Sequence, residues 1–302
     1  MKHLLVVTLA MFLFWSGYQT YQHPQLKFNS LTDRISKPFD TRLRYRIAEV
    51  DPRFKLSLEQ VQAISEQAAQ IWKDGTGQDY LVYDPKAQLA IHLIYDERQI
   101  ESEQRREHLS QLESNQQRWR EKKKSLDQVE QEILQSRQFL GLKQQQLNQQ
   151  IQTYQQKQQQ ARQNPAVFAN PDDLQQRQHA LQQNVQSLKQ EIDQYNQKIQ
   201  QLNQQVDELN ALDQQLNVSV DQYKQRFKPH LFHKGLFNGK QILIYEFESE
   251  DDLRLTLAHE FGHALGLQHT GDPHALMHPI MRDQDRAHFR LTEADLSLLK
   301  AR

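Results

Sequence analysis

One segment of the chain carries residues whose types and spacing indicate a metal site, namely HEFGHALGLQH beginning at His259. On a helix, His259 and His263 share one face, so both imidazoles can bind the same ion. Glu260 follows the first histidine and can reach a water on that ion as a general base. Gly266 can adopt a left-handed conformation that ends the helix and turns His269 toward the third coordination position. Three neutral imidazoles leave a fourth position for water, which is the arrangement of a catalytic zinc site.

The elements that must position these residues lie in a polar chain. It has 302 residues, of which 37% are hydrophobic, and its mean hydropathy is -0.86. This apolar fraction is too low for a chain packed entirely around ordinary cores, so part of it must be elongated and covered by solvent. The absence of cysteine excludes a disulfide scaffold, a thiolate metal site and a cysteine nucleophile. The net charge of -1 argues against nucleic acid as a partner.

The Gln-rich segment 99–228 accounts for most of this polarity. From Leu181 to Leu209, apolar residues alternate at spacings of four and three, which is the seam of a coiled coil. Pro165 and Pro171 interrupt the segment, so the sequence predicts two long helices that form an antiparallel hairpin. A parallel homodimer of interrupted helices is the alternative. Polar seam positions in the first half also favour a third helix or an unknown protein partner that binds through the coiled coil.

The segments on either side of the coiled coil have the patterns of a globular domain. The predicted elements are a strand from Leu43 to Ile47, a helix capped by Ser57 that ends near Gly75, and strands at 80–83, 89–95 and 241–247. Asn238 and Gly239 lie between two apolar runs and predict a hairpin before the last of these strands.

Residues 1–24 predict export. Lys2 and His3 precede the uncharged residues 4–15, a pattern that resembles the basic and apolar regions of a signal peptide. No cleavage site with small residues is evident, and the apolar run is short for a membrane span. Two alternatives stay open: a cleaved signal peptide, or an uncleaved membrane anchor formed by residues 4–18. Both place the protein in the periplasm or outside the cell of a bacterium.

The zinc motif resembles that of the metzincin metallopeptidases, and its surroundings are similar to the matrixin type. His269 is followed by Thr270, where matrixins usually carry Ser or Thr. Met277 lies in Ala-Leu-Met-His-Pro, which is similar to the matrixin Met-turn Ala-Leu-Met-Tyr-Pro. The resemblance implies that Met277 forms an apolar base beneath the metal and that Pro279 belongs to the specificity-pocket wall. It also implies that Asp295 braces the Met-turn.

The fold class implied by this resemblance is α+β. It would be a metzincin-type catalytic domain with a mixed twisted sheet, an active-site helix, a Met-turn and a C-terminal helix. Its two halves are residues 25–98 and 229–302, and the antiparallel coiled-coil hairpin of residues 99–228 interrupts it.

The additional metal sites of animal matrixins have no matching ligand set in this sequence. His230 and His233 read as ordinary polar residues of an edge segment. The acidic run from Glu246 to Asp252 is compatible with calcium, but the N-terminus of the helix that follows explains it more simply. Calcium is therefore not supported as a cofactor.

The function implied is that of an exported zinc endopeptidase acting on protein or peptide substrates, which would pair with an edge strand within Leu231–Phe237. The alternative is a coiled-coil adaptor or tether whose peptidase-like domain is a non-catalytic binding module. Many matrixins are kept latent by a propeptide cysteine, and the lack of cysteine excludes that mechanism. The coiled-coil arm is therefore the candidate regulator of access to the site.

Overall fold

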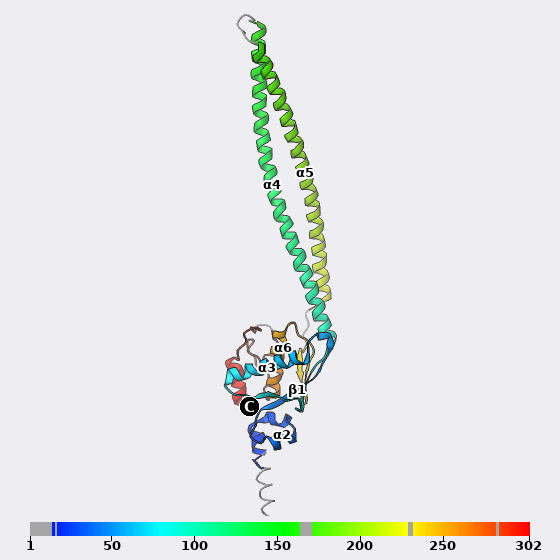
Figure 1. Ribbon diagram of the computed structural model, residues 1–302, viewed down its shortest axis with the longest axis vertical. Helices are drawn as coiled ribbons and strands as arrows, with labels where there is room; N and C mark the ends of the chain where they lie inside the picture. Colours follow the sequence, from blue (N-terminus) through cyan, green and yellow to red (C-terminus); the bar gives the residue numbers. More distant parts are fainter. Residues whose placement is uncertain (1–13, 16, 164–170, 229–231, 282–283) are drawn as a thin grey trace, which may run out of the picture. The chain divides into compact units, whose positions relative to one another are not determined.

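The computed structural model describes residues 14–163, 171–228, 232–281 and 284–302, with residue 16 left out (Figure 1). The chain divides into two compact units. The sheet unit comprises the described residues of Met1–Arg106 and Pro229–Arg302. The helical unit comprises those of Glu107–Lys228.

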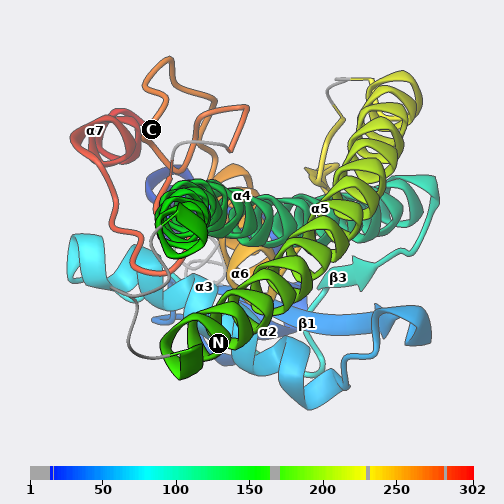
Figure 2. The same cartoon turned by 90° about the horizontal axis from the view of Figure 1, so that it is seen from above.

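A mixed five-stranded sheet forms the centre of the sheet unit. Its strands are β1 (Leu43–Val50), β2 (Leu81–Tyr83), β3 (Leu89–Leu93), β4 (Gly235–Phe237) and β5 (Gln241–Ile244). They lie in the order β2-β1-β3-β5-β4, with β4 antiparallel to β5 and the other pairs parallel. Figure 2 shows β1 and β3 running side by side. This order places β4 at one edge of the sheet, next to β5, the strand that directly precedes the metal motif in sequence.

The turn between β4 and β5 confirms the predicted hairpin. Gly239 has a φ of 85°, a left-handed conformation that glycine adopts without strain. Asn238 Oδ1 accepts hydrogen bonds from the backbone N–H groups two and three positions on, at 3.1 and 3.0 Å. β5 ends at Ile244, earlier than predicted, because the chain then leaves the sheet and the N–H of Phe247 donates to Gln99 instead.

The helix predicted after Ser57 is confirmed as α3 (Leu58–Thr76). The Ser57 side chain accepts a hydrogen bond from the Gln60 N–H, and the Gln60 side chain accepts one from the Ser57 N–H, which is a capping box. The helix ends slightly later than predicted because the left-handed C-terminal position, with a φ of 72°, belongs to Gly77. Two further short elements of the domain are η2 (Pro52–Phe54) and α7 (Glu293–Ala301).

The metal motif lies on α6 (Glu250–Ala264), which packs against both α3 and the sheet. The indole N–H of Trp72 on α3 donates to the carbonyl of Ala258 at 2.9 Å. The ring of Tyr45 on β1 lies 4.8 Å from the ring of Phe261, measured between centroids. The fully buried core therefore fixes α6 to elements that precede the Gln-rich segment in sequence.

Two short helices before β1 have no counterpart among the sequence predictions. They are η1 (Pro24–Phe28) and α2 (Leu31–Ser36). The buried Asn29 between them donates from Nδ2 to the carbonyl of Arg42 at 2.8 Å and accepts from the N–H of Arg44 at 2.8 Å. Such bonds between one side chain and a strand backbone leave no periodic pattern in the sequence, which is why this segment was not predicted.

The Gln-rich segment forms two long helices, α4 (Glu97–Gln163) and α5 (Pro171–Arg226). Lys122 Nζ lies 2.6 Å from Glu208 Oε2, and Lys143 also forms an ion pair with Glu191. In these pairs the residue number on α5 falls as the residue number on α4 rises, so the paired stretches run antiparallel. Figure 1 shows the two helices alongside each other.

The inner face of the helical unit carries buried members of the predicted apolar pattern, namely Leu126, Ile133, Leu147 and Leu188. The predicted turn around Pro165 lies outside the described residues. The coiled-coil hairpin as a whole therefore stays a prediction.

No helix within the described residues is long and apolar enough to cross a membrane. Most of the predicted export segment, residues 1–24, and of the predicted anchor, residues 4–18, lies outside the described residues. Export, and the choice between cleavage and anchoring, stay predictions.

Candidate metal centre

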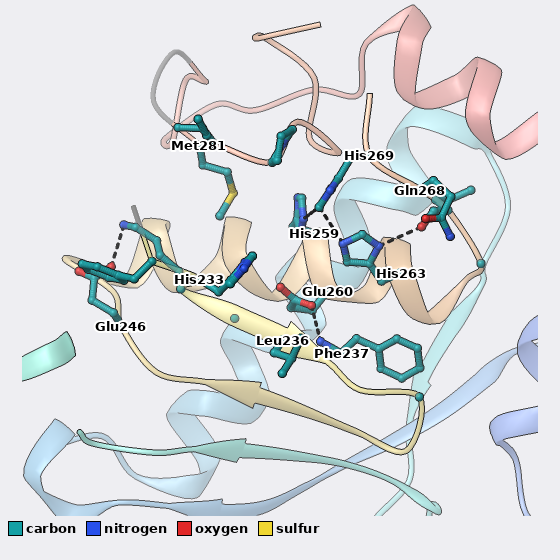
Figure 3. A pocket seen from close by; sticks show the side chains of 18 of the residues that line it. His233, Leu236, Phe237, Glu246, His259, Glu260, His263, Gln268, His269 and Met281 are labelled. Carbon is teal, nitrogen blue, oxygen red and sulfur yellow. Dashed lines mark hydrogen bonds and ion pairs between the residues drawn. The ribbon is translucent and has the colours of Figure 1, made fainter. Parts of the chain in front are cut away.

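α6 and the turn that follows it bring three histidines together (Figure 3). His269 Nε2 lies 3.3 Å from His259 Nε2 and 3.2 Å from His263 Nε2. The ligand atoms of the three residues all lie within 4.8 Å of one another. The helix ends at Ala264, and Gly266, with a φ of 97°, reverses the chain so that His269 returns to the helix face.

Backbone carbonyls orient two of the imidazoles. The Nδ1 atom of His259 lies 2.6 Å from the carbonyl oxygen of Leu276, and that of His263 lies 2.9 Å from the carbonyl oxygen of Leu267. We assign the proton of each ring to Nδ1, because a carbonyl oxygen can only accept. This assignment leaves the Nε2 lone pairs directed at one point, as in rings that bind a metal.

Burial favours the neutral, metal-binding form of all three rings. It lowers the pKa of His259 to about 3, and it also lowers the pKa values of His263 and His269. The neighbouring imidazoles act in the same direction on His259 and His269. A pocket that holds three neutral nitrogen donors with an open side matches the donor set that zinc prefers in catalytic sites.

Glu260 is buried next to this cluster, with 4% of its surface exposed. Its Oε2 accepts a hydrogen bond from the backbone N–H of Phe237 on β4 at 2.7 Å (Figure 3). Burial raises its pKa to about 7, against the smaller opposing effect of that hydrogen bond. A carboxyl group with a pKa near neutrality can both take up and release a proton under ordinary conditions.

Met277 lies beneath α6 and is fully buried. A Cβ atom added to Gly262 would come within 2.3 Å of its sulfur, so the helix and Met277 are in close contact. The carboxylate of Asp295 accepts hydrogen bonds from the N–H groups of Leu276 and Met277, at 3.0 and 2.9 Å. The same turn therefore supplies both the apolar floor and the carbonyl that orients His259.

A cleft of about 1150 Å³ runs past the histidines and Glu260. β4 borders it on one side, and Pro279 and Met281 border it on another. His233, which the sequence predicts to be an ordinary polar residue of an edge segment, also lines the cleft (Figure 3). Its position depends on how the chain enters β4, for which the sequence carries no signal. His230 lies outside the described residues.

Comparison with known families places this geometry in context. The family model described as matrixin matches residues 37–301. The chain belongs to the matrixin family. The metzincin resemblance read from the zinc motif is thereby confirmed, and the five-stranded mixed sheet with α6 represents the metzincin fold.

Individual relatives match over a shorter stretch. Human neutrophil collagenase is 42% identical over 50 residues, which cover 17% of this chain and 11% of that protein. Matrix metalloproteinase-16 of Rattus norvegicus and that of Homo sapiens are each 46% identical over 46 residues, 15% of this chain and 8% of theirs. The matched stretches thus cover only a small part of these relatives.

Membership of the matrixin family places a metallopeptidase-type domain within residues 37–301 of the chain. Matrixins normally bind zinc, and the described residues include one cluster of three histidines that could hold a metal ion. The chemistry of these donors fits that ion.

Proposed function

We propose that the protein is an exported zinc endopeptidase in which His259, His263 and His269 hold the metal and Glu260 is the general base. The observation that carries this proposal is the convergence of the three Nε2 atoms beside the buried carboxylate of Glu260. The proposal keeps the predicted domain boundaries, with a catalytic domain formed by residues 25–98 and 229–302.

The roles of the residues follow from their positions. A bound zinc ion supplies a Lewis acid that polarises the scissile carbonyl and acidifies water. Glu260 takes the proton of the attacking water on its carboxylate and delivers it to the leaving amine. The N–H of Phe237 favours the ionised carboxylate, whereas burial favours the protonated one, so the group is suited to both steps.

β4 is the proposed substrate-binding strand. It lies at the edge of the sheet, where an extended peptide can pair with its free side. The peptide would run antiparallel to β4, with its scissile bond above Glu260 and one side chain directed toward the wall that includes Pro279. Met277 would support the ligand histidines from below.

The test is cleavage of peptides by the purified full chain, with and without a chelator. Wild-type cleavage that stops on chelation and returns with zinc supports the proposal. Glu260→Ala should retain zinc and lose cleavage. Cleavage that is undiminished both by the chelator and by Glu260→Ala would refute the proposal. Binding of peptides without cleavage would favour the adaptor alternative, which the length of α4 and α5 also favours.

The proposal extends to the helical unit, which we expect to be an antiparallel coiled-coil hairpin that controls access to the cleft or recruits substrate. Deletion of residues 110–222, with a short linker, removes most of α4 and α5 and retains the first turns of α4. We expect cleavage of short peptides to persist and cleavage of protein substrates to change. Unchanged activity on both would contradict a regulatory role.

A further inference from the structure

The first turns of α4 form hydrogen bonds with the two residues Glu246 and Phe247, which follow β5 at the open end of the β4–β5 hairpin. Ser102 Oγ donates a hydrogen bond to Glu246 Oε1 at 2.6 Å, and Gln99 Oε1 accepts one from the N–H of Phe247 at 3.0 Å. Both contacts are buried and join residues more than 140 positions apart. The chain that leaves β5 is therefore fixed to the start of α4, beside the cleft that Ser102 also lines.

Two buried carboxylates face one ammonium group at this place. Lys234 Nζ lies 2.6 Å from Asp252 Oδ2 and 3.1 Å from Glu246 Oε2. Each acidic residue is only 1% exposed, and Arg286 approaches the other oxygen of Asp252 at 3.6 Å. Buried carboxylates that lose their cation are strongly destabilised, so the position of Lys234 is tightly coupled to both of them.

The helix N-terminus explains this acidic run only in part. Asp252 lies in the first turn of α6, where its N–H is capped by Ser249. Glu246 lies before the helix and is held by Ser102 and Lys234 instead. The two carboxylates thus join three elements, namely the start of α4, the entry to β4 and the first turn of α6.

Lys234 immediately precedes β4. Its carbonyl accepts a hydrogen bond from the N–H of Tyr245 at 2.8 Å, which begins the pairing with the returning strand. Next along β4, Gly235 lies against Glu260, since an added Cβ would come within 2.7 Å of Oε1. Phe237 then donates its N–H to the same carboxyl group. Four consecutive residues, Lys234 and the three residues of β4, therefore make both the ion pairs with the acidic residues and the contacts with Glu260.

We propose that Lys234 is a positioning residue for peptide binding, because its ion pairs with Glu246 and Asp252 hold β4 against α6 with its free edge open to an extended substrate. Ser102 supports it by fixing the carboxylate of Glu246. The inference rests on the proposed function, in which β4 receives the substrate. It assigns to the start of α4 a part in building the peptide-binding edge.

The test measures equilibrium binding by calorimetry to the zinc-loaded full chain carrying Glu260→Gln, in which turnover does not interfere. Two probes are compared: blocked octapeptides with Leu, Phe or Ala at the centre, which can pair along β4, and acetohydroxamate, which binds the metal alone. Lys234→Met keeps the aliphatic stem and removes the charge. We expect Lys234→Met to weaken octapeptide binding by about tenfold and to leave acetohydroxamate binding unchanged. Lys234→Arg, which keeps the charge, should recover most of the lost octapeptide affinity.

Two further variants separate positioning from folding. Ser102→Ala should weaken octapeptide binding by about threefold alone and add nothing to Lys234→Met, because both act through Glu246. Lys240→Met removes an exposed cation from the nearby turn and should have no effect.

Three results would overturn the proposal. Lys234→Met could leave octapeptide affinity unchanged, or it could weaken the binding of octapeptides and acetohydroxamate equally. The third is that the parent chain with Glu260→Gln binds none of the octapeptides. Octapeptide binding without any cleavage by the wild type would contradict the peptidase function instead.

Discussion

The backbone N–H of Phe237 donates to Glu260 Oε2 at 2.7 Å, so the edge strand holds the carboxylate that we propose as the general base. The donor belongs to the backbone and cannot be removed by replacing the Phe237 side chain. The orientation of Glu260 therefore depends on where β4 lies. This dependence links the strand that we expect to bind substrate with the group that we expect to transfer protons.

Glu260→Gln should remove proton transfer while preserving the shape of the site. We expect kcat/KM for peptide cleavage to fall by about 10² to 10⁴, the usual contribution of a positioned acid–base group. Zinc content should stay the same, because the three histidines are untouched. Steady-state kinetics and metal analysis of the same preparation provide the measurement. Glu66→Gln, on the exposed face of α3, is the matched control, and a Glu260→Gln enzyme within tenfold of wild type would exclude Glu260 as the base.

Gly235→Ala should displace Glu260 without touching a metal ligand. The added Cβ would lie 2.7 Å from Oε1 and 2.9 Å from Cγ of Glu260, so either the carboxyl side chain or β4 must move. We expect kcat to fall by about tenfold or more. Gly271→Ala is the control, because a Cβ there meets nothing within 4 Å. If both variants cleave peptides like the wild type, the close approach of β4 to Glu260 has no catalytic importance.

The sequence predicts the histidine cluster because its geometry is local. His259 and His263 are one helical turn apart, and Gly266 marks the reversal that returns His269. The capping of α3 by Ser57 and the hairpin before β5 are local in the same way. In each case a few neighbouring residues determine the backbone, so the residue types suffice.

The contacts that orient the site could not be predicted in this way. Ser102 and Glu246 are 144 positions apart, and no periodicity relates a residue at the start of α4 to one after β5. The bond from Phe237 to Glu260 likewise depends on the packing of β4 over α6. From the sequence, the acidic run is explained by the helix N-terminus alone, because the sequence does not show that Lys234 lies between Glu246 and Asp252.

The stability of the metal-free chain should depend on pH through Glu260. Burial raises its pKa to about 7, whereas the exposed group titrates near 4.5. Between these values the folded state retains a proton that the unfolded state has lost, so the free energy of unfolding falls as pH rises. Glu260→Gln removes this titration. Its unfolding free energy relative to wild type should therefore increase by about 3 kcal/mol from pH 4.5 to pH 7.

Urea unfolding in the presence of a chelator, at several pH values, measures this difference. The depressed pKa of His259 has the opposite sign and makes both proteins more stable as pH rises from about 3 to 6.5. Because this contribution is common to the two proteins, it cancels when their unfolding free energies are subtracted. A difference that is constant with pH would show that Glu260 is not buried as described.

Asp295→Asn should weaken both the fold and the metal site. The buried carboxylate accepts the N–H groups of Leu276 and Met277, and the carbonyl of Leu276 in turn orients His259. An amide nitrogen in place of one oxygen would face a backbone N–H and leave it without an acceptor. We expect the unfolding free energy to fall by about 3 kcal/mol. Zinc affinity should fall by roughly 10- to 100-fold, since the orientation of a ligand histidine is disturbed.

Asp285→Asn provides the control for this last prediction. Asp285 Oδ1 also accepts two backbone N–H groups, those of Ala287 and His288 at 3.0 and 3.1 Å, but its side chain is 63% exposed. Water can replace the lost acceptor there, so we expect a loss of about 0.5 kcal/mol or less and unchanged zinc affinity. Urea unfolding and competition with a chelator of known affinity distinguish the two sites. Equal effects of the two substitutions on zinc affinity would mean that Asp295 does not act through His259.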